Sequence, residues 1–289
     1  MPCRPPLPWV KVVWFGGLIV ACYAPILYAL IREWGTNDDM GHGFFVPLLS
    51  GFIVWQRREE LLALKLRPNW WGLAVVVLGG LQLFVATLGA EIASARGAFV
   101  VTLIGSVWLL GGTVILKKLA FPLFLLFFMI PIPAVIYNQI TFPLQKVASW
   151  LAASALAAID IPVLREGNIL DLPSGPLAVV EACSGIRSLL SLTFLALVYG
   201  YFFETTTWIR CVVFAATIPI AILANGCRVT ITGILAQWKP ELAEGFFHES
   251  TGWVVFMIAV LFLVVFHQFL VRTIGFVNKR RLGHGVSQE

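Results

Sequence analysis

Long runs of apolar residues, separated by short polar segments, dominate the chain. Most of these runs approach the length of about 20 residues that an α-helix needs to cross the hydrocarbon core of a bilayer. The pattern therefore predicts an all-α membrane protein, a polytopic bundle of about eight transmembrane helices. The expected spans are residues 12–31, 44–56, 72–90, 98–116, 119–136, 185–203, 209–227 and 251–271.

Two stretches between the fifth and the sixth span depart from this pattern. Residues 142–159 include Gln145, Lys146 and Trp150 among many alanines, which is typical of an amphipathic helix. We expect this helix to lie on the outer surface of the membrane rather than to cross it.

The second stretch reads as extended chain. Residues 163–172 and 177–182 are separated by the turn-forming residues Pro173-Ser174-Gly175-Pro176, which predicts a short hairpin-like segment outside the membrane. A substrate peptide could pair with such a segment by strand addition.

Composition agrees with a membrane location. Only 12% of the 289 residues are charged, against about 25% in soluble domains, and the mean hydropathy is +0.89. No linker or low-complexity segment divides the chain, so residues 1–289 are expected to form one integral membrane domain. The net charge of +5 does not indicate a nucleic-acid partner, because basic residues in such a chain mostly report topology.

Cysteines and possible metal ligands add little to this picture. The five cysteines are an odd number without framework spacing, so no disulfide scaffold is expected. No set of His, Cys or carboxylate residues has the spacing of metal ligands, and neither a metal site nor a cofactor is expected.

Positive charge predicts the orientation. With the N-terminus inside and residues 142–159 on the outer surface, both tails, 1–11 and 272–289, are cytoplasmic, as the positive-inside rule favours. If residues 142–159 crossed, the last three spans would invert. In the preferred arrangement 13 of the 20 Lys and Arg residues are inside: Arg4, Lys11, Arg57, Arg58, Lys65, Arg67, Lys117, Lys118, Arg210, Arg272, Lys279, Arg280 and Arg281.

This topology brings three chemically capable residues to the outer face. Cys183 precedes the sixth span, Arg228 lies near the outer end of the seventh, and His248 precedes the eighth. A helix N-terminus and a nearby arginine lower the pKa of a thiol and favour the nucleophilic thiolate. A histidine can carry the proton, and an arginine can donate to an oxyanion. The set suits acyl transfer from a peptide bond through a thioester.

Taken singly, these residues also have structural interpretations. Arg228 could be a snorkelling or helix-pairing charge, and His248 a loop histidine. Free cysteines within membrane helices usually serve only as small apolar side chains, and this interpretation is preferred for Cys3, Cys22, Cys211 and Cys227. His42 follows an acidic loop on the outer side and could line the same cavity, whereas His267 is interpreted as structural.

The motifs around these residues resemble the exosortase/archaeosortase family. The resemblance extends from about residue 36 to 271 and includes the early segment Gly41-His42-Gly43-Phe44-Phe45-Val46-Pro47-Leu48 and Arg165-Glu166-Gly167-Asn168. It continues with Glu181-Ala182-Cys183-Ser184-Gly185-Ile186-Arg187-Ser188, Asn225-Gly226-Cys227-Arg228, and His248 with Gly252-Trp253.

The resemblance implies a cysteine protease/transpeptidase of the plasma (inner) membrane with its active site on the extracytoplasmic side. Its substrates would be exported proteins with a C-terminal sorting tail of the PEP-CTERM kind: a Pro-Glu-Pro-type signal, a transmembrane helix and a basic end. Lipid-linked molecules or polysaccharides are the possible acceptors. The resemblance assigns Cys183 as nucleophile, with Arg228 and His248 as partners. The supporting candidates are Glu181, Ser184, Arg187, Asn225 and His42.

Two other functions stay open at this point. A transporter would line a path with polar residues, but the spans hold few acidic residues and no series suited to proton relay. A lipid- or polysaccharide-processing membrane enzyme would use His and Arg to bind phosphate and would retain activity when Cys183 is replaced by serine.

Overall fold

The computed structural model describes residues 9–179, 185–239 and 245–285. The chain divides into two compact units, with the boundary between residues 133 and 134. We call residues up to Pro133 the first unit and residues from Ala134 the second unit.

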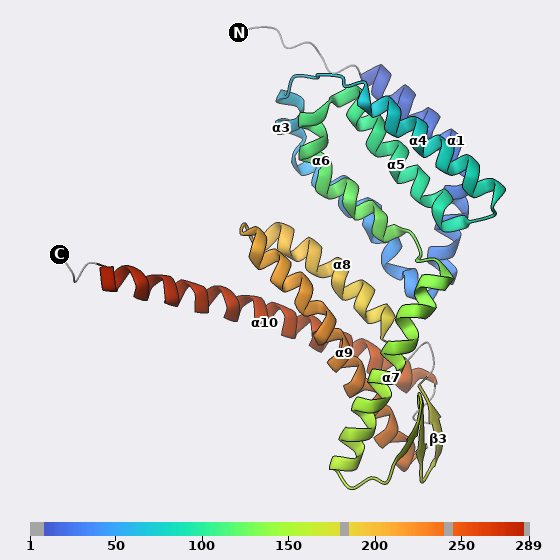
Figure 1. Ribbon diagram of the computed structural model, residues 1–289, viewed down its shortest axis with the longest axis vertical. Coiled ribbons are helices and arrows are strands. Elements are labelled where there is room, and N and C mark those ends of the chain that lie inside the picture. Colours follow the sequence, from blue (N-terminus) through green and yellow to red (C-terminus); the bar gives the residue numbers. More distant parts are fainter. Residues whose placement is uncertain (1–8, 180–184, 240–244, 286–289) are drawn as a thin grey trace. The chain divides into compact units, whose positions relative to one another are not determined.

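The first unit consists of helices (Figure 1). It contains α1 (Trp9–Thr36), η1 (Asp38–Phe44), α2 (Phe45–Gln56), α3 (Arg58–Ala63), α4 (Trp71–Leu88), α5 (Ile92–Gly111), α6 (Thr113–Leu125) and η2 (Leu126–Met129).

The second unit combines helices with a small sheet. It contains α7 (Ala134–Ala158), β1 (Leu164–Glu166), β2 (Ile169–Leu172), β3 (Gly175–Ala178), α8 (Ile186–Phe203), α9 (Thr207–Trp238) and α10 (Gly245–Gly285).

The helices confirm an all-α polytopic membrane protein. Six helices of the described chain are long and apolar enough to cross a membrane: those in α1, α4, α5, α8, α9 and α10. A seventh span results if α6–η2 and α7 are counted as one span that is interrupted around Pro131 and Pro133. The expected count of eight spans is thus not confirmed.

The largest difference from the expected spans concerns the fifth, residues 119–136, which is divided among α6, η2 and the first residues of α7. The second expected span, residues 44–56, coincides with α2 but is short. Here α2 has only 12 residues, a length of about 18 Å against the about 30 Å of a hydrocarbon core. The polar segment before it contains the 3-10 helix η1, and α2 ends at Gln56, before the basic pair Arg57-Arg58. Hydropathy predicted a membrane span here. The structure has an apolar helix at this place, but the helix is too short to cross the membrane alone.

Close backbone contact joins α4 and α5 in the first unit. A Cβ added to Gly72 would lie 2.2 Å from the backbone nitrogen of Leu109, and one added to Gly105 would lie 2.7 Å from that of Val76. Small residues at such positions let membrane helices pack at short distance.

Polar contacts fasten α1 to α5. The buried Arg96 guanidinium forms an ion pair with Glu33, and the Tyr23 hydroxyl lies 2.7 Å from Oγ1 of Thr102. Both α1 and α5 are candidate spans, where the alternative to such pairing is a polar group exposed to hydrocarbon.

In the second unit α9 is the central helix. It packs against α7 through Gly226 and Gly233, whose added Cβ atoms would lie 2.9 Å from Leu151 and 3.0 Å from Leu156. α9 also packs against α8 and α10. The three helices share an apolar core that includes Leu192, Val213, Ile220, Ala259 and Leu263.

The sheet of the second unit has three antiparallel strands in the order β1-β2-β3. The expected hairpin is therefore extended by one strand, because the chain also reverses at Gly167-Asn168. Gly167 has φ +65°, which suits the first central position of a two-residue hairpin turn. Two hydrogen bonds to the Gly167 carbonyl, from Oγ of Ser149 at 3.0 Å and Nη1 of Arg165 at 2.9 Å, hold this turn.

One face of the sheet is anchored on the helices. Leu170 and Leu172 of β2 are buried with Leu156 of α7 and Val229 of α9. Their neighbours Ile169 and Asp171 are exposed, as expected for a strand with alternating faces.

Candidate active site

The candidate site begins where α8 begins. Gly185, the residue before α8, has φ +80° and lies against the side chain of Asn225 on α9. A Cβ at Gly185 would be 2.7 Å from Cγ and 2.8 Å from Cβ of Asn225. The backbone at this point therefore needs glycine both for its left-handed conformation and for the close approach.

A second contact joins α9 to α10. An added Cβ on Gly252 would lie 3.2 Å from Cζ and 3.3 Å from Nε of Arg228, so the guanidinium group lies beside the backbone of α10. Arg228 is half-buried and Asn225 is buried. Because the two residues are three apart, they are on neighbouring positions of one helix face.

These two contacts connect parts of the three sequence motifs. Gly185 follows Cys183 by two residues, Asn225 and Arg228 belong to one motif, and Gly252 follows His248 by four residues, about one helical turn. The structure thus brings together backbone from the Cys183 and His248 motifs at one stretch of α9.

The remaining predicted residues have different outcomes. Glu181, Cys183 and Ser184 lie outside the described residues. His248 belongs to the first turn of α10, with only its backbone described. Arg187 is exposed in the first turn of α8. The roles assigned to these residues stay predictions.

The arrangement around Gly185 favours negative charge. The N-terminus of α8 begins at Ile186, directly after Gly185. A helix N-terminus carries partial positive charge and stabilises a nearby anion, including a thiolate. Arg228 adds a full positive charge on the adjacent helix.

His42 lies in the first unit, half-buried in η1. Burial lowers its pKa below the ordinary value, while hydrogen bonds with the backbone of Phe128 and of Asp39 act in the opposite direction. The next residue, Gly43, is buried, and its added Cβ would be 2.5 Å from the Trp34 ring. The early motif therefore has a packing role within the first unit, and a place for His42 beside Cys183 stays a prediction.

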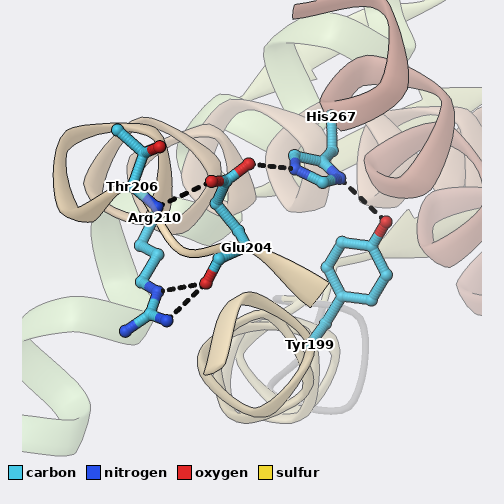
Figure 2. Close-up of polar contacts among 5 residues, drawn as sticks. All are labelled: Tyr199, Glu204, Thr206, Arg210 and His267. Carbon is cyan, nitrogen blue, oxygen red and sulfur yellow. Dashed lines mark hydrogen bonds and ion pairs between the residues drawn. The ribbon is translucent and has the colours of Figure 1, made fainter. Parts of the chain in front are cut away.

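A polar network joins α8, α9 and α10 away from the contacts of Gly185 and Gly252 (Figure 2). The sequence did not predict it. The Tyr199 hydroxyl lies 2.9 Å from Nδ1 of His267, and Nε2 of His267 lies 3.2 Å from a carboxylate oxygen of Glu204. The other carboxylate oxygen accepts from the Thr206 backbone N–H at 2.7 Å, and Arg210 donates to the Glu204 carbonyl.

The network is well separated from the candidate site along these helices. Glu204 follows the last residue of α8, and His267 is 15 residues beyond Gly252 on α10, a rise of about 22 Å. His267 and Glu204 expose only 8% and 10% of their side chains, so leaving either without its partner would be costly. The expectation that His267 is structural agrees with these contacts.

The network predicts a pH-dependent contribution to stability. The Thr206 backbone N–H lowers the pKa of Glu204 from 4.5 to about 2, helped by His267 and opposed by burial. Because the pKa is depressed in the folded state, this contribution is complete above about pH 4.5 and is lost as the pH falls towards 2. We expect the thermal midpoint of the detergent-solubilised protein to fall over this range, and to fall less in the Glu204→Gln variant.

Tryptophan fluorescence during heating measures this midpoint. Glu59→Gln is the matched control, because the Glu59 side chain is 89% exposed. Identical acid sensitivity of the wild type and Glu204→Gln would contradict the assignment.

Among the described residues, no group of three or more His, Cys, Asp or Glu side chains is arranged to hold a metal ion. The described part of the candidate site consists of the hydrogen-bond donors Asn225 and Arg228 and the N-terminus of α8.

The comparisons with known proteins give one match. A family model described as transmembrane exosortase matches residues 34–265, which include Gly185, Asn225, Arg228 and Gly252. The searches of curated proteins and of solved structures found no match.

Proposed function

The chain belongs to the transmembrane exosortase family, and on this premise we propose that it is a membrane cysteine protease/transpeptidase that removes C-terminal sorting tails from exported proteins. The tail would consist of a PEP-CTERM-like signal, a transmembrane helix and a basic end. The enzyme would act from the plasma membrane on the extracytoplasmic side.

In the proposed reaction, each chemical step is carried out by a named residue. His248 takes the proton of the Cys183 thiol, and the thiolate attacks the carbonyl carbon at the cleavage site. Arg228 donates hydrogen bonds to the oxyanion that forms. The C–N bond then breaks, His248 returns the proton to the departing amine, and the exported part of the substrate is left as a thioester on Cys183.

Resolution of the thioester completes the cycle. Water, or a nucleophilic group of a lipid-linked or polysaccharide acceptor, attacks the thioester carbonyl and releases the thiol. Glu181, Ser184, Arg187, Asn225 and His42 are the candidates for supporting or substrate-binding roles.

One observation supports the proposal more than any other. Gly185 contacts Asn225, and Gly252 contacts Arg228, so chain segments that directly adjoin Cys183 and His248 lie against the same stretch of α9. Residues that must cooperate are thereby attached to segments that both contact α9, which favours their approach to one another.

Co-expression with a tail-bearing exported protein tests the function. We expect the wild-type enzyme to shorten that protein by its transmembrane helix and basic end, with a new C-terminus located by mass spectrometry just before the helix. The controls are cells without the enzyme and a substrate with a scrambled signal. An unaltered substrate beside abundant folded enzyme would contradict the proposal.

A further inference from the structure

The outer edge of β3 has backbone groups suited to receive another strand. β3 pairs with β2 on one side, with Ala178 opposite Ile169 and Leu177 opposite Leu170. Just beyond the strand, the Val179 N–H donates to the Asn168 carbonyl at 2.8 Å. In an antiparallel ladder, residue pairs that exchange hydrogen bonds alternate with pairs that do not.

This alternation assigns a direction to each peptide group. Since Val179 and Leu177 face β2, Ala178 directs both its N–H and its carbonyl away from β2. Pro176, two residues earlier, directs only a carbonyl outward because proline has no N–H. A proline at this position is typical of an edge strand. Within the strand that the structure describes, the edge thus offers one complete donor–acceptor residue, Ala178, which is exposed.

The two edges of the sheet are not equivalent. β1 and β2 pack against α7, and the edge residue Arg165 of β1 folds its side chain back onto the Gly167 carbonyl. β3 instead continues towards the candidate site: Ala178 precedes Cys183 by five residues and Gly185 by seven. An extended chain covers about 3.3 Å per residue, so Ala178 is at most about 17 Å from Cys183.

We propose that β3 is the docking strand for the substrate: the extended segment that precedes the transmembrane helix of the sorting tail adds as a fourth strand, with its backbone hydrogen-bonded to Ala178. This inference rests on the proposed function, because it requires a substrate whose flexible chain enters the membrane at the site. Strand addition gives affinity through backbone hydrogen bonds, so it tolerates many different exported proteins.

The direction of the added strand follows from topology. β3 leads to α8, a candidate span, and the substrate segment likewise leads into a transmembrane helix. Two chains that both run towards the membrane pair in parallel. In a parallel ladder the Ala178 N–H and carbonyl bond two substrate residues that are two positions apart.

Removal of the Ala178 N–H is the first test. Ala178→Pro deletes the donor on the outer edge but no hydrogen bond to β2, and Ala178→Val retains the donor as a matched control. We expect Ala178→Pro to raise KM for the tail-bearing substrate about tenfold with kcat unchanged, as for one lost hydrogen bond. We expect Ala178→Val to stay within about twofold of the wild type.

Disulfide cross-linking is the second test and does not depend on turnover. In the Cys183→Ala background, Ala178→Cys is paired with substrates that carry one cysteine at successive positions before the transmembrane helix. We expect cross-links at every second position, as the alternation of a strand requires. Glu166→Cys on β1 is the control and should give background yield, as should Cys183→Ala alone.

The outcomes separate the two proposals. Equal cross-linking from Glu166→Cys and Ala178→Cys, or no cross-link from Ala178→Cys while the wild type cleaves the same substrates, overturns strand addition alone. Cleavage by Cys183→Ala itself overturns the proposed function.

Discussion

Replacing Cys183 with alanine is expected to lower the rate of tail cleavage by at least about 10⁴-fold, the scale found when a covalent nucleophile is removed. Without the thiol, no thioester forms, and only binding and oxyanion stabilisation are left. The measurement is the fraction of a co-expressed tail-bearing protein that is shortened, with enzyme abundance matched between variants.

Two control variants show whether the loss of activity is specific to the Cys183 thiol. Cys227→Ala removes a thiol that is exposed on α9 and should leave the rate within about twofold, in keeping with a non-nucleophilic cysteine. Cys183→Ser should be nearly as inactive as Cys183→Ala, because a serine hydroxyl is a far weaker nucleophile at the same pH. Full activity of Cys183→Ser would instead favour a lipid or polysaccharide enzyme that uses His and Arg.

Arg228→Ala is expected to lower kcat by about 10²–10³-fold, the usual cost of one oxyanion donor. The guanidinium lies beside the backbone of Gly252, on the helix that carries His248, so its loss removes a fixed positive charge from the proposed oxyanion site. Arg228→Lys should recover part of the rate, because an ammonium group retains the charge but not the planar set of donors.

Arg272→Ala is the matched control for this second prediction. Arg272 is exposed near the other end of α10, and we expect its replacement to change kcat by less than about twofold. A further variant, Gly252→Ala, adds a Cβ 3.2 Å from Cζ of Arg228 and should lower kcat by shifting the guanidinium. Normal kcat for Arg228→Ala would exclude Arg228 from the oxyanion site.

Local sequence signals predicted much of the fold. The apolar run 185–203 became α8 at Ile186–Phe203, because a glycine precedes the run and a charged residue follows it. The 12-residue α2 shows the limit of hydropathy, which does not say whether a short apolar helix crosses the membrane. The third strand was missed because Gly167-Asn168 interrupts a run that was interpreted as one extended segment.

The candidate site was predicted in part for a related reason. Topology and motifs predicted Cys183, Arg228 and His248 at one level, and this stays a prediction. The described contacts are those of Gly185 with Asn225 and of Gly252 with Arg228. What the sequence does not contain is which side chain meets each glycine, since this depends on how α8, α9 and α10 rotate about their axes. The Tyr199–His267–Glu204 network was missed because its members are separated by up to 68 residues and follow no motif.

Capture of the acyl-enzyme decides whether Cys183 is the nucleophile. The purified wild-type enzyme is mixed with a tail-bearing substrate, quenched in acid within one turnover, digested and analysed by mass spectrometry. We expect the exported part of the substrate to be attached to the peptide that contains Cys183, through a bond that neutral hydroxylamine cleaves. Cleavage without an adduct at Cys183 when turnover is slowed, or with the adduct on another residue, would contradict this expectation.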